Sequence, residues 1–589
     1  MCVGVPKLAL DRPFTYLVPE GASVDTGTLV SVPFHGRTVD GWVLGSARET
    51  PNEGLLPIRK VRSGVRFFDP RLLELLRWVS ARYITPLCTV IERSHPPRVV
   101  SEERVREPAA REVPRPVGGS VLQKYGGAEA LLEPGATTWL RPLPSEEADV
   151  CVATVGACLS AGHRAIVLVP EAEPVPFTAR AVRDAFGHRA CAFMGGDARS
   201  RYRAWLDIQS GGYDVVVSTR PGVFAPLPDV GLIWTSREVH PGHREDRAPY
   251  YHVRDVAIAR ARLEGAACIL SSLVPSVETV EASARGGVRI SRPSRPIERA
   301  AAPLVETAPP GAEDRSVRLT QLLKTVRSAA LIVSRRGYGV ARSCRSCGEP
   351  AACPACGGPI VAEGGEVRCA VCGAAGECAH CGGRSFGVER GGVERVAEWA
   401  RGRGTTPVVQ ADDGTVPLPG TITVGTAATV KDVGPTGLDL VAILDADRAV
   451  ARAGIHSGEQ ALATWAEAAA WTGPRRGGGR VLVQTRRPAH PAVQALVRWE
   501  PVGFLMSEAD RRRQAGFPPG HAVFRIHGTG ELSQTMKESG AETVLSTAAE
   551  TGTVCLVAVP QGQLASFKDE IVRLAAKGTV TRVEAEPQV

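Results

Sequence analysis

Eight of the fifteen cysteines fall within residues 344–381, as four Cys-x-x-Cys pairs that are each followed by glycine. A zinc ion takes four sulfur ligands, and a two-residue gap lets both cysteines of a pair reach one metal through a tight turn. Four disulfides would instead require an oxidising compartment, which nothing else in the sequence indicates. We therefore predict two zinc ions per chain, held by Cys344, Cys347, Cys353, Cys356, Cys369, Cys372, Cys378 and Cys381.

Spacing alone leaves open how the eight ligands divide between two metals. Sequential pairing joins the first two Cys-x-x-Cys units and then the last two. Nested pairing places Cys344, Cys347, Cys378 and Cys381 on zinc 1 and Cys353, Cys356, Cys369 and Cys372 on zinc 2. The segment between the two inner pairs has the length of a β-hairpin, with Gly364-Gly365 at its tip. This hairpin favours nesting.

Length and composition indicate a multidomain protein of the cytoplasm. A chain of 589 residues is too long to fold around one hydrophobic core. The net charge of +8 permits nucleic-acid binding without establishing it. Its positive charge is mostly arginine, which codon bias in a high-GC genome explains more simply than phosphate binding does. No apolar window is long enough to span a membrane, and the N-terminus lacks the pattern of a signal peptide. We expect a cytoplasmic, nucleoid-associated protein with no membrane partner.

The helices and strands that must position the cysteines are expected to form a multidomain α/β fold. Short strands up to about residue 62, among them 14–18, precede an amphipathic helix over 70–84. Buried apolar runs that alternate with helices then predict two parallel-sheet lobes, with the cysteine module inserted in the second and a small α+β domain at the end. We place the N-terminal β domain at 1–95, a polar linker at 96–124, lobe 1 at 125–297, lobe 2 at 298–343 and 383–505, the cysteine module at 344–382, and the C-terminal domain at 506–589.

Distinctive strings along most of the chain carry a family resemblance. They include RPFTYLVP at 12–19, LVPE at 168–171, PYYHVRDVA at 249–257, RRGY at 335–338 and LDAD at 444–447. In order and spacing the chain resembles the bacterial primosomal replication protein N′ (PriA) family, in an actinobacterial-like form. The resemblance implies a superfamily 2 DNA helicase fold with two RecA-like lobes and a 3′-end DNA-binding domain, acting in replication restart.

The catalytic motifs depart from that family. Its glycine-rich phosphate loop falls in register on residues 144–148, which puts Glu147 at the lysine position and Ala148 at the magnesium-ligand position. Carboxylates beside a γ-phosphate repel it, and a proline-containing loop without glycine offers no nest of N–H groups. The family's DEEH box falls on 236–239, where serine and arginine replace the magnesium aspartate and the water-orienting glutamate.

Three further motifs have changed as well, at residues 271–276, 425–435 and 470–478, although the second of them keeps Gly425, Thr426 and Lys431. In the last of these Arg475 or Arg476 could stand in for the family's arginine finger. The chain also contains no Gly-Lys pair that could form another phosphate loop. Without the lysine and both acids, nothing neutralises the charge of phosphoryl transfer. We predict no ATPase and no helicase activity, and we expect neither ATP nor Mg²⁺ as a cofactor.

Features that would bind DNA are better preserved. The family's 3′-end pocket centres on an F-D-Y motif, here Phe14-Thr15-Tyr16, in which the aromatic rings could stack on a terminal base. Packing in the domain core is an equal alternative for Phe14 and Tyr16. The family's winged helix should follow, but the linker at 96–124 is too short and polar to form one. Arginine pairs predict phosphate contacts, principally Arg335, Arg336, Arg475 and Arg476.

We therefore expect a catalytically inactive PriA-like protein with two structural zinc ions. It would bind forked or single-stranded DNA at stalled forks and nucleate primosome assembly with single-stranded-DNA-binding protein and other primosome components. A weak 3′-5′ helicase with a displaced nucleotide site is one alternative. A zinc-ribbon protein–protein adaptor is the other.

Overall fold

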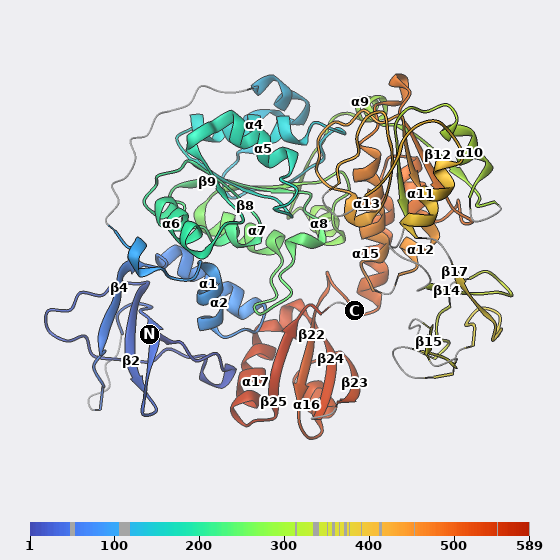
Figure 1. Cartoon of the computed structure of the whole chain (residues 1–589). Helices are drawn as coiled ribbons and strands as arrows, with labels where there is room; N and C mark the ends of the chain where they lie inside the picture. The colour runs from blue at the N-terminus through green and yellow to red at the C-terminus, as the bar shows by residue number, and fades with distance from the viewer. Residues whose placement is uncertain are drawn as a thin grey trace.

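The computed structural model describes residues 1–47, 54–104, 118–311, 315–333, 341–349, 351–355, 360–363, 366–369, 374–375, 377–389, 392–411, 415–452, 454–549 and 552–587. Figure 1 shows an N-terminal domain, two α/β lobes side by side, a cysteine module beneath the second lobe and a C-terminal domain beneath the first. The predicted class, a multidomain α/β chain with two parallel sheets, is confirmed.

The N-terminal domain holds a four-stranded antiparallel sheet in the order β1-β3-β2-β4. One predicted strand is wrong: residues 14–18 are irregular, and Leu17 only bridges Pro57. The predicted helix forms as α1, because Asp69 accepts a hydrogen bond from the Leu72 N–H and Pro70 starts the first turn. The elements are β1 (Cys2–Val3), η1 (Leu8–Leu10), β2 (Thr28–Phe34), β3 (Arg37–Trp42), β4 (Lys60–Arg66), α1 (Pro70–Arg82) and α2 (Leu87–Ser94).

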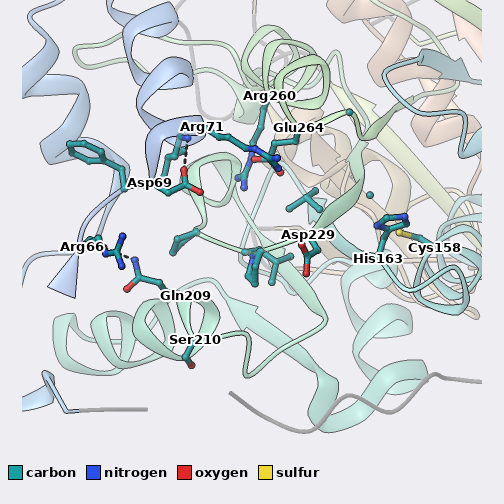
Figure 2. A pocket seen from close by; sticks show the side chains of 18 of the residues that line it. Arg66, Asp69, Arg71, Cys158, His163, Gln209, Ser210, Asp229, Arg260 and Glu264 are labelled. Atoms are coloured by element: carbon teal, nitrogen blue, oxygen red, sulfur yellow. Dashed lines mark hydrogen bonds and ion pairs between the residues drawn. The ribbon is translucent and has the colours of Figure 1, made fainter. Parts of the chain in front are cut away.

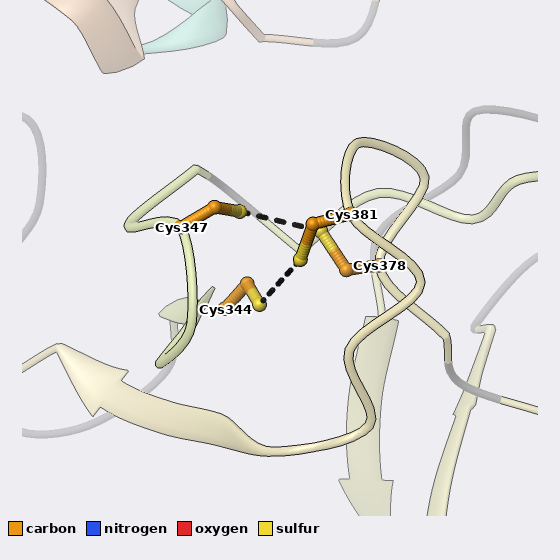
Figure 3. Close-up of side chains that lie close together, drawn as sticks. All are labelled: Cys344, Cys347, Cys378 and Cys381. Atoms are coloured by element: carbon orange, nitrogen blue, oxygen red, sulfur yellow. Dashed lines mark hydrogen bonds between the residues drawn. The ribbon is translucent and has the colours of Figure 1, made fainter.

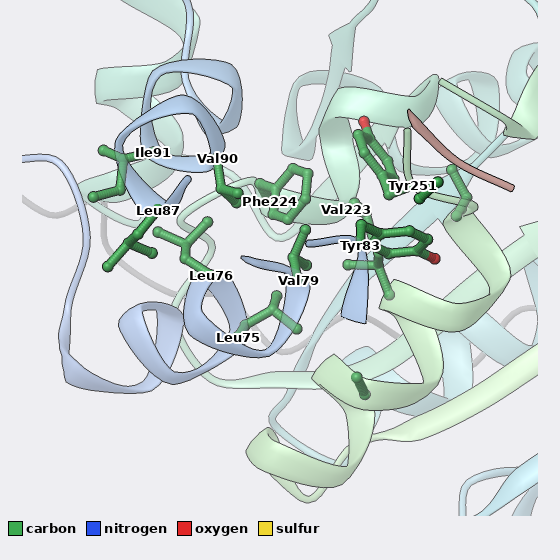
Figure 4. Packing of buried hydrophobic residues seen from close by; sticks show 14 of the residues in the cluster. Leu75, Leu76, Val79, Tyr83, Leu87, Val90, Ile91, Val223, Phe224 and Tyr251 are labelled. Carbon is green, nitrogen blue, oxygen red and sulfur yellow. The ribbon is translucent and has the colours of Figure 1, made fainter. Parts of the chain in front are cut away.

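Helices α1 and α2 fasten this domain to lobe 1. Their apolar side chains, including Leu76 and Val79, are fully buried in one cluster with Val223, Phe224 and Tyr251 of lobe 1 (Figure 4). Burying a large apolar side chain stabilises a fold by about 1.5–3 kcal/mol. The N-terminal domain and lobe 1 therefore share one core.

Lobe 1 is a seven-stranded parallel sheet in the order β11-β5-β10-β9-β6-β8-β7. Its five inner strands are largely apolar and buried, as expected where helices cover both faces, whereas the edge strands β11 and β7 are partly exposed. The strands are β5 (Thr137–Leu140), β6 (Arg164–Leu168), β7 (Ala190–Phe193), β8 (Val215–Ser218), β9 (Val230–Ser236), β10 (Ala267–Ser271) and β11 (Arg289–Ser291). The helices are α3 (Gly127–Leu131), α4 (Glu147–Ser160), α5 (Phe177–Phe186), α6 (Ala198–Gln209), α7 (Val253–Glu264), α8 (Val277–Ala284) and α9 (Arg295–Ala301).

Lobe 2 is a six-stranded parallel sheet in the order β12-β21-β20-β13-β19-β18. Its strands are β12 (Leu304–Ala308), β13 (Ala329–Val333), β18 (Val408–Gln410), β19 (Ile422–Thr426), β20 (Leu440–Ile443) and β21 (Arg480–Gln484). Its helices are α10 (Val317–Leu323), α11 (Val393–Arg401), α12 (Ala446–Val450), α13 (Ser457–Ala469), α14 (Pro491–Val497) and α15 (Val502–Gln514).

The cysteine module lies between β13 and α11 and contains two small antiparallel pairs. Strands β14 (Ala341–Cys344) and β17 (Phe386–Glu389) pair at its base. Strands β15 (Ile360–Glu363) and β16 (Glu366–Cys369) form the predicted hairpin. The C-terminal domain contains a four-stranded sheet in the order β23-β24-β22-β25 and two helices. Its elements are β22 (His521–Gly528), α16 (Leu532–Glu538), β23 (Thr543–Ala549), β24 (Gly552–Pro560), α17 (Leu564–Ala576) and β25 (Val580–Ala585).

The predicted linker is ordered at both ends. Its start forms η2 (Val100–Glu102), where Glu102 pairs with Arg199 and Arg203 of α6, and its end forms η3 (Gly119–Tyr125). Residues 105–117 lie outside the described part of the chain. Among the described helices, none is long and apolar enough to cross a membrane.

Candidate functional site

The loop between β5 and α4 occupies the place of a phosphate-binding loop in a parallel α/β lobe. It starts after Leu140, ends at Glu146 and contains no glycine. Helix α4 begins at Glu147, and Asp149 lies in the same first turn. The partial positive charge of a helix N-terminus normally attracts a phosphate. Here acidic side chains occupy the first turn instead. Glu147, which the sequence register aligned with the family's phosphate-binding lysine, is the first residue of this helix.

Glu147 faces a cavity of about 50 Å³ that elements of both lobes line. Asp432 and Glu467 of lobe 2 line the same cavity. Burial raises the pKa of Glu147 to about 8, and the nearby carboxylates of Asp432 and Glu467 add to the shift. Burial also raises the pKa of Glu467. Cavities that hold small molecules have volumes of about 300–1,000 Å³, so this acidic cavity is too small for a triphosphate in this structure.

Contacts from lobe 2 border this site. The carbonyl of Asp432 accepts a hydrogen bond from the Phe177 N–H at 2.8 Å, and its carboxylate accepts one from the Thr178 N–H at 2.9 Å. Asp432 thus caps helix α5 of the other lobe. At Gly434, an added Cβ would approach the Phe177 ring to 2.6 Å. The two lobes are therefore packed tightly against each other beside the acidic cavity.

A second interlobe contact joins Lys431 to Glu171 across 2.8 Å. Burial opposes ionisation of Glu171, but hydrogen bonds from His240 and Lys431 outweigh it and hold the pKa of Glu171 at about 2. Lys431 is the lysine retained in the altered 425–435 motif. In this structure it binds a carboxylate of the opposite lobe.

The residues at the DEEH position have structural contacts. Ser236 ends β9, and its hydroxyl accepts a hydrogen bond from the Trp234 indole at 3.0 Å. Arg237 is 3% exposed; its guanidinium donates to the Val430 carbonyl at 3.1 Å and lies 3.4 Å from Glu467. The arginine that replaces the family's glutamate therefore joins the lobes.

Glu238 is completely buried, and its carboxylate accepts a hydrogen bond from the Ser276 N–H at 2.6 Å. Burial raises the pKa of Glu238 to about 7. Ser276 in turn caps α8 through the Thr279 N–H. The one acid left in the box thus positions the 271–276 segment rather than facing a metal.

The candidate arginine fingers lie away from the cavity. Arg475 and Arg476 form the exposed turn η9 (Arg475–Gly477), whose backbone binds the carbonyl of Ala302. The part of the 470–478 motif that lines the cavity is Ala470 and Trp471. Neither arginine is positioned to contact a nucleotide there, whereas both are open to solvent.

A larger cavity, of about 940 Å³, lies between the N-terminal domain and lobe 1 (Figure 2). His163, Asp229 and Gly265, which line it, precede strands β6, β9 and β10. It therefore opens at the amino ends of the parallel strands, whereas ligands of such sheets bind at the carboxyl ends. Its buried Arg260 is already held by Glu264 at 2.7 Å. We assign this cavity to the domain interface.

The four outer cysteines lie together, as nested pairing requires. The sulfur atoms of Cys344, Cys347, Cys378 and Cys381 all lie within 4.8 Å of one another (Figure 3). The Cys344–Cys381 and Cys347–Cys378 sulfurs are 3.5 and 3.7 Å apart. A zinc–sulfur bond of about 2.3 Å would place the sulfurs of a tetrahedral site about 3.8 Å apart. The spacing therefore fits a four-sulfur metal site and is far too long for disulfides.

Two turns of the same design build this cluster. Gly348 and Gly382 adopt φ of 76° and 69°, and each N–H donates to the carbonyl of the first cysteine in its pair at 2.8 Å. The positive φ of these turns is the reason for the glycine after each of the two outer pairs. Backbone N–H groups from Cys347 and Ser346 outweigh burial and lower the pKa of Cys344 to about 6. A metal would stabilise the remaining thiolates.

The inner cluster is described only in part. Cys353 and Cys369 are buried in one small cluster next to Phe386. The N–H of Cys369 donates to the Ala374 carbonyl at 2.9 Å. The outer pairs make the same hydrogen bond, from Cys344 to Glu349 and from Cys378 to Gly383. Cys356 and Cys372 lie outside the described residues, as do Arg335 and Arg336. The second zinc site and those two DNA contacts stay predictions.

Phe14 and Tyr16 are half-buried against the small N-terminal sheet. Phe14 meets Phe34 edge-on with ring centroids 5.1 Å apart, and the Tyr16 hydroxyl donates to the Pro33 carbonyl at 3.0 Å. Thr15, at the position of the lost acid, is exposed. Packing against the domain core thus buries part of the Phe14 and Tyr16 rings, and the rest of each ring is exposed.

Comparisons with known proteins agree along most of the chain. Residues 2–96 match the family described as 3'DNA-binding domain (3'BD) of PriA. The probable replication restart protein PriA of Mycobacterium tuberculosis (strain ATCC 25618 / H37Rv) is 31% identical over 564 residues, covering 88% of this chain and 85% of that protein. This chain belongs to the PriA family. The PriA of Treponema pallidum is 27% identical, covering 87% of this chain and 84% of that protein.

Among solved structures, RecG bound to a three-way DNA junction matches 74% of this chain and 53% of that chain, with 10% identity and a TM-score of 0.38.

Reasoning from the sequence did not predict the contacts between the two lobes. Lys431 and Asp432 could have pointed to these contacts, because two adjacent charged residues in an altered motif each need a binding partner. Their partners, Glu171 and the start of α5, are too distant in sequence for spacing to identify.

Proposed function

We propose that this chain is a PriA-family replication restart protein that binds forked or single-stranded DNA without hydrolysing ATP. It would nucleate primosome assembly by recruiting single-stranded-DNA-binding protein and other primosome components. The observation that carries the proposal is the small, acidic cavity at the phosphate position. Glu147, Asp432 and Glu467 line a cavity of about 50 Å³ there.

Electrostatics supports the loss of ATP turnover independently of volume. Phosphoryl transfer requires cations or N–H dipoles around the triphosphate. At this site the cations Lys431 and Arg237 are already engaged, by Glu171 at 2.8 Å and Glu467 at 3.4 Å. Binding a nucleotide would mean breaking both contacts and separating the lobes.

Retention of the metal module supports a binding role. The outer cysteines have the spacing and the backbone turns that a zinc ion needs, so Cys344, Cys347, Cys378 and Cys381 would hold zinc 1 and the inner four zinc 2. Zinc would supply the fold of a segment too small to have its own core. The 3'BD match over residues 2–96 and the exposed Arg475 and Arg476 support contacts to DNA.

The first experiment measures ATP hydrolysis by the purified full chain with and without forked DNA. Glu147→Ala is the matched control, because it removes the acid without adding a phosphate ligand. We expect wild type and control to remain at the no-enzyme background. DNA-stimulated turnover by wild type well above that control would refute the absence of ATPase activity and favour the weak helicase.

The second experiment compares fluorescence anisotropy on a fork and on a linear duplex of equal length across a salt series. We expect tighter binding to the fork. The salt slope should fall by about 0.9 for each phosphate that is no longer neutralised in Arg475→Gln or Arg476→Gln. Equal affinity for the two DNAs would refute fork recognition. Absence of any DNA binding would favour the adaptor alternative.

A further inference from the structure

We propose that a cavity between the lobes binds a small organic carboxylate with an apolar body. The cavity has a volume of about 390 Å³, within the range of about 300–1,000 Å³ that is usual for small-molecule sites. It is distinct from the acidic cavity at the phosphate position, although Lys431 lines both. Binding of such a ligand does not depend on whether the chain hydrolyses ATP, so the two proposals are tested separately.

The cavity lies where the topology of lobe 2 favours a ligand. In that sheet β13 lies between β20 and β19; the chain continues from β13 to β18 and β19 on one side, and from β20 to β21 on the other. Neighbouring parallel strands with connections to opposite sides form a topological switch point, and ligands bind outside the carboxyl ends of such strands. Val333, which ends β13, and Ile443, which ends β20, both line the cavity. The cavity therefore lies at the switch point of lobe 2.

Both lobes contribute to the cavity, and most of its wall is apolar. Val430 and the α13 residues Ala461 and Trp465 add apolar side chains from lobe 2. Lobe 1 contributes Pro241 and Arg237 from the segment after β9. Small-molecule sites typically combine an apolar wall with a few polar groups that orient the ligand. The body of the ligand should therefore be apolar.

The charged groups in the wall favour an anion. The cavity is lined by three cations and two carboxylates, namely Arg237, Lys431, Arg452, Glu171 and Asp445. Glu467, the ion-pair partner of Arg237, lines the acidic cavity instead. Burial lowers the pKa of His240, which therefore adds no charge near pH 7. One excess positive charge matches a ligand with a single anionic group, whereas the wall carboxylates oppose a triphosphate.

Two of these cations have hydrogen-bond donors to spare. Arg237 is 3% exposed; its Nη2 donates to the Val430 carbonyl, but its Nη1 has no acceptor among the described residues. A buried donor without an acceptor is unfavourable. The neighbouring Lys431 has three N–H donors, and its one acceptor in the described part of the chain is Glu171. A ligand carboxylate would supply the acceptors that these donors lack.

Isothermal titration calorimetry on the full chain tests the proposal with two matched ligands. The first is 2-naphthoate, and the second is 2-naphthamide, which has the same ring system and no charge. We expect the carboxylate to bind about tenfold more tightly, because a hydrogen bond to a charged group contributes at least that factor. Equal affinities, or no binding of 2-naphthoate at millimolar concentration, would overturn the proposal. ATP that binds more tightly than 2-naphthoate and displaces it would also overturn it, in favour of a displaced nucleotide site.

Two variants locate the site. Ala428, on η8 (Ala427–Thr429), is exposed and lines the cavity, so the indole of Ala428→Trp should fill it and abolish binding of 2-naphthoate. The matched control Ala565→Trp, at an exposed position on α17, should bind like wild type.

Glu171→Gln should bind 2-naphthoate severalfold more tightly, because it removes the carboxylate that competes for Lys431, and should leave the affinity for 2-naphthamide unchanged. Such a gain cannot come from a misfolded protein. Unchanged or weaker binding of 2-naphthoate by Glu171→Gln would overturn the assignment, as would binding at wild-type strength by Ala428→Trp.

Discussion

Replacing Glu147 by glutamine should stabilise this protein, and the gain should grow with pH. Burial beside Asp432 and Glu467 raises the pKa of Glu147 to about 8 in the fold. In the unfolded chain a glutamate has a pKa of about 4.3. Between those values the folded chain keeps a proton that the unfolded chain has lost, so the free energy of unfolding falls as pH rises.

The size of the effect follows from these two pKa values. Between pH 5.5 and pH 7.5 the penalty for Glu147 grows from about 1.7 to about 4.2 kcal/mol, an increase of up to about 2.5 kcal/mol. Glutamine has the same shape and no charge, so Glu147→Gln should lose this dependence. The difference in unfolding free energy between the two proteins should therefore widen by up to that amount.

Urea unfolding monitored by circular dichroism at several pH values between 5.5 and 8.5 measures this difference. Asp569→Asn, a comparable change at an exposed position on α17, is the control and should show no pH-dependent gain. Two results would refute the reasoning. One is a difference that stays constant with pH, and the other is a Glu147→Gln protein less stable than wild type above pH 7.

Three further outcomes are expected. Cys344→Ser and Cys369→Ser should each lower zinc content from two ions to one per chain by plasma mass spectrometry; loss of both ions in each variant would contradict two independent sites. Gly383→Ala should release zinc severalfold faster to a chromophoric chelator, because its Cβ would lie 3.2 and 3.3 Å from two of the cluster sulfurs; an unchanged rate would show that the loop can shift. Glu147→Lys should not restore phosphate release from ATP, since the acids of the DEEH box are also gone; DNA-stimulated turnover would contradict this.

Local patterns predicted the parts of the fold that depend on local physics. The helix at α1 followed from apolar spacing, and the hairpin of β15 and β16 from turn residues between two short apolar runs. The strand expected at residues 14–18 did not form: Phe14 and Tyr16 pack against the neighbouring sheet, whereas Leu17 and Val18 are largely exposed. Leu17 bridges Pro57 there in place of a ladder.

The candidate site was only half accessible to such reasoning. Register identified Glu147 as the replacement for the phosphate lysine, but not its neighbours. Asp432 and Glu467 lie some 300 residues further along the chain, and only the packing of one lobe on the other brings them to Glu147. Sequence could therefore show that a cation was missing, and not that two more carboxylates lie close by.

The loss of ATP turnover that we propose and the contacts between the lobes would have one physical cause. A motor that opens and closes on ATP needs lobes that separate at modest cost in each cycle. Here Lys431, Arg237 and Asp432 make contacts between the lobes, and separating the lobes would break them. Carboxylates at the phosphate position would oppose nucleotide binding, so a nucleotide would contribute little binding energy to offset that cost. Under the proposed function, these contacts would keep the two lobes and the cysteine module in a constant arrangement for binding DNA.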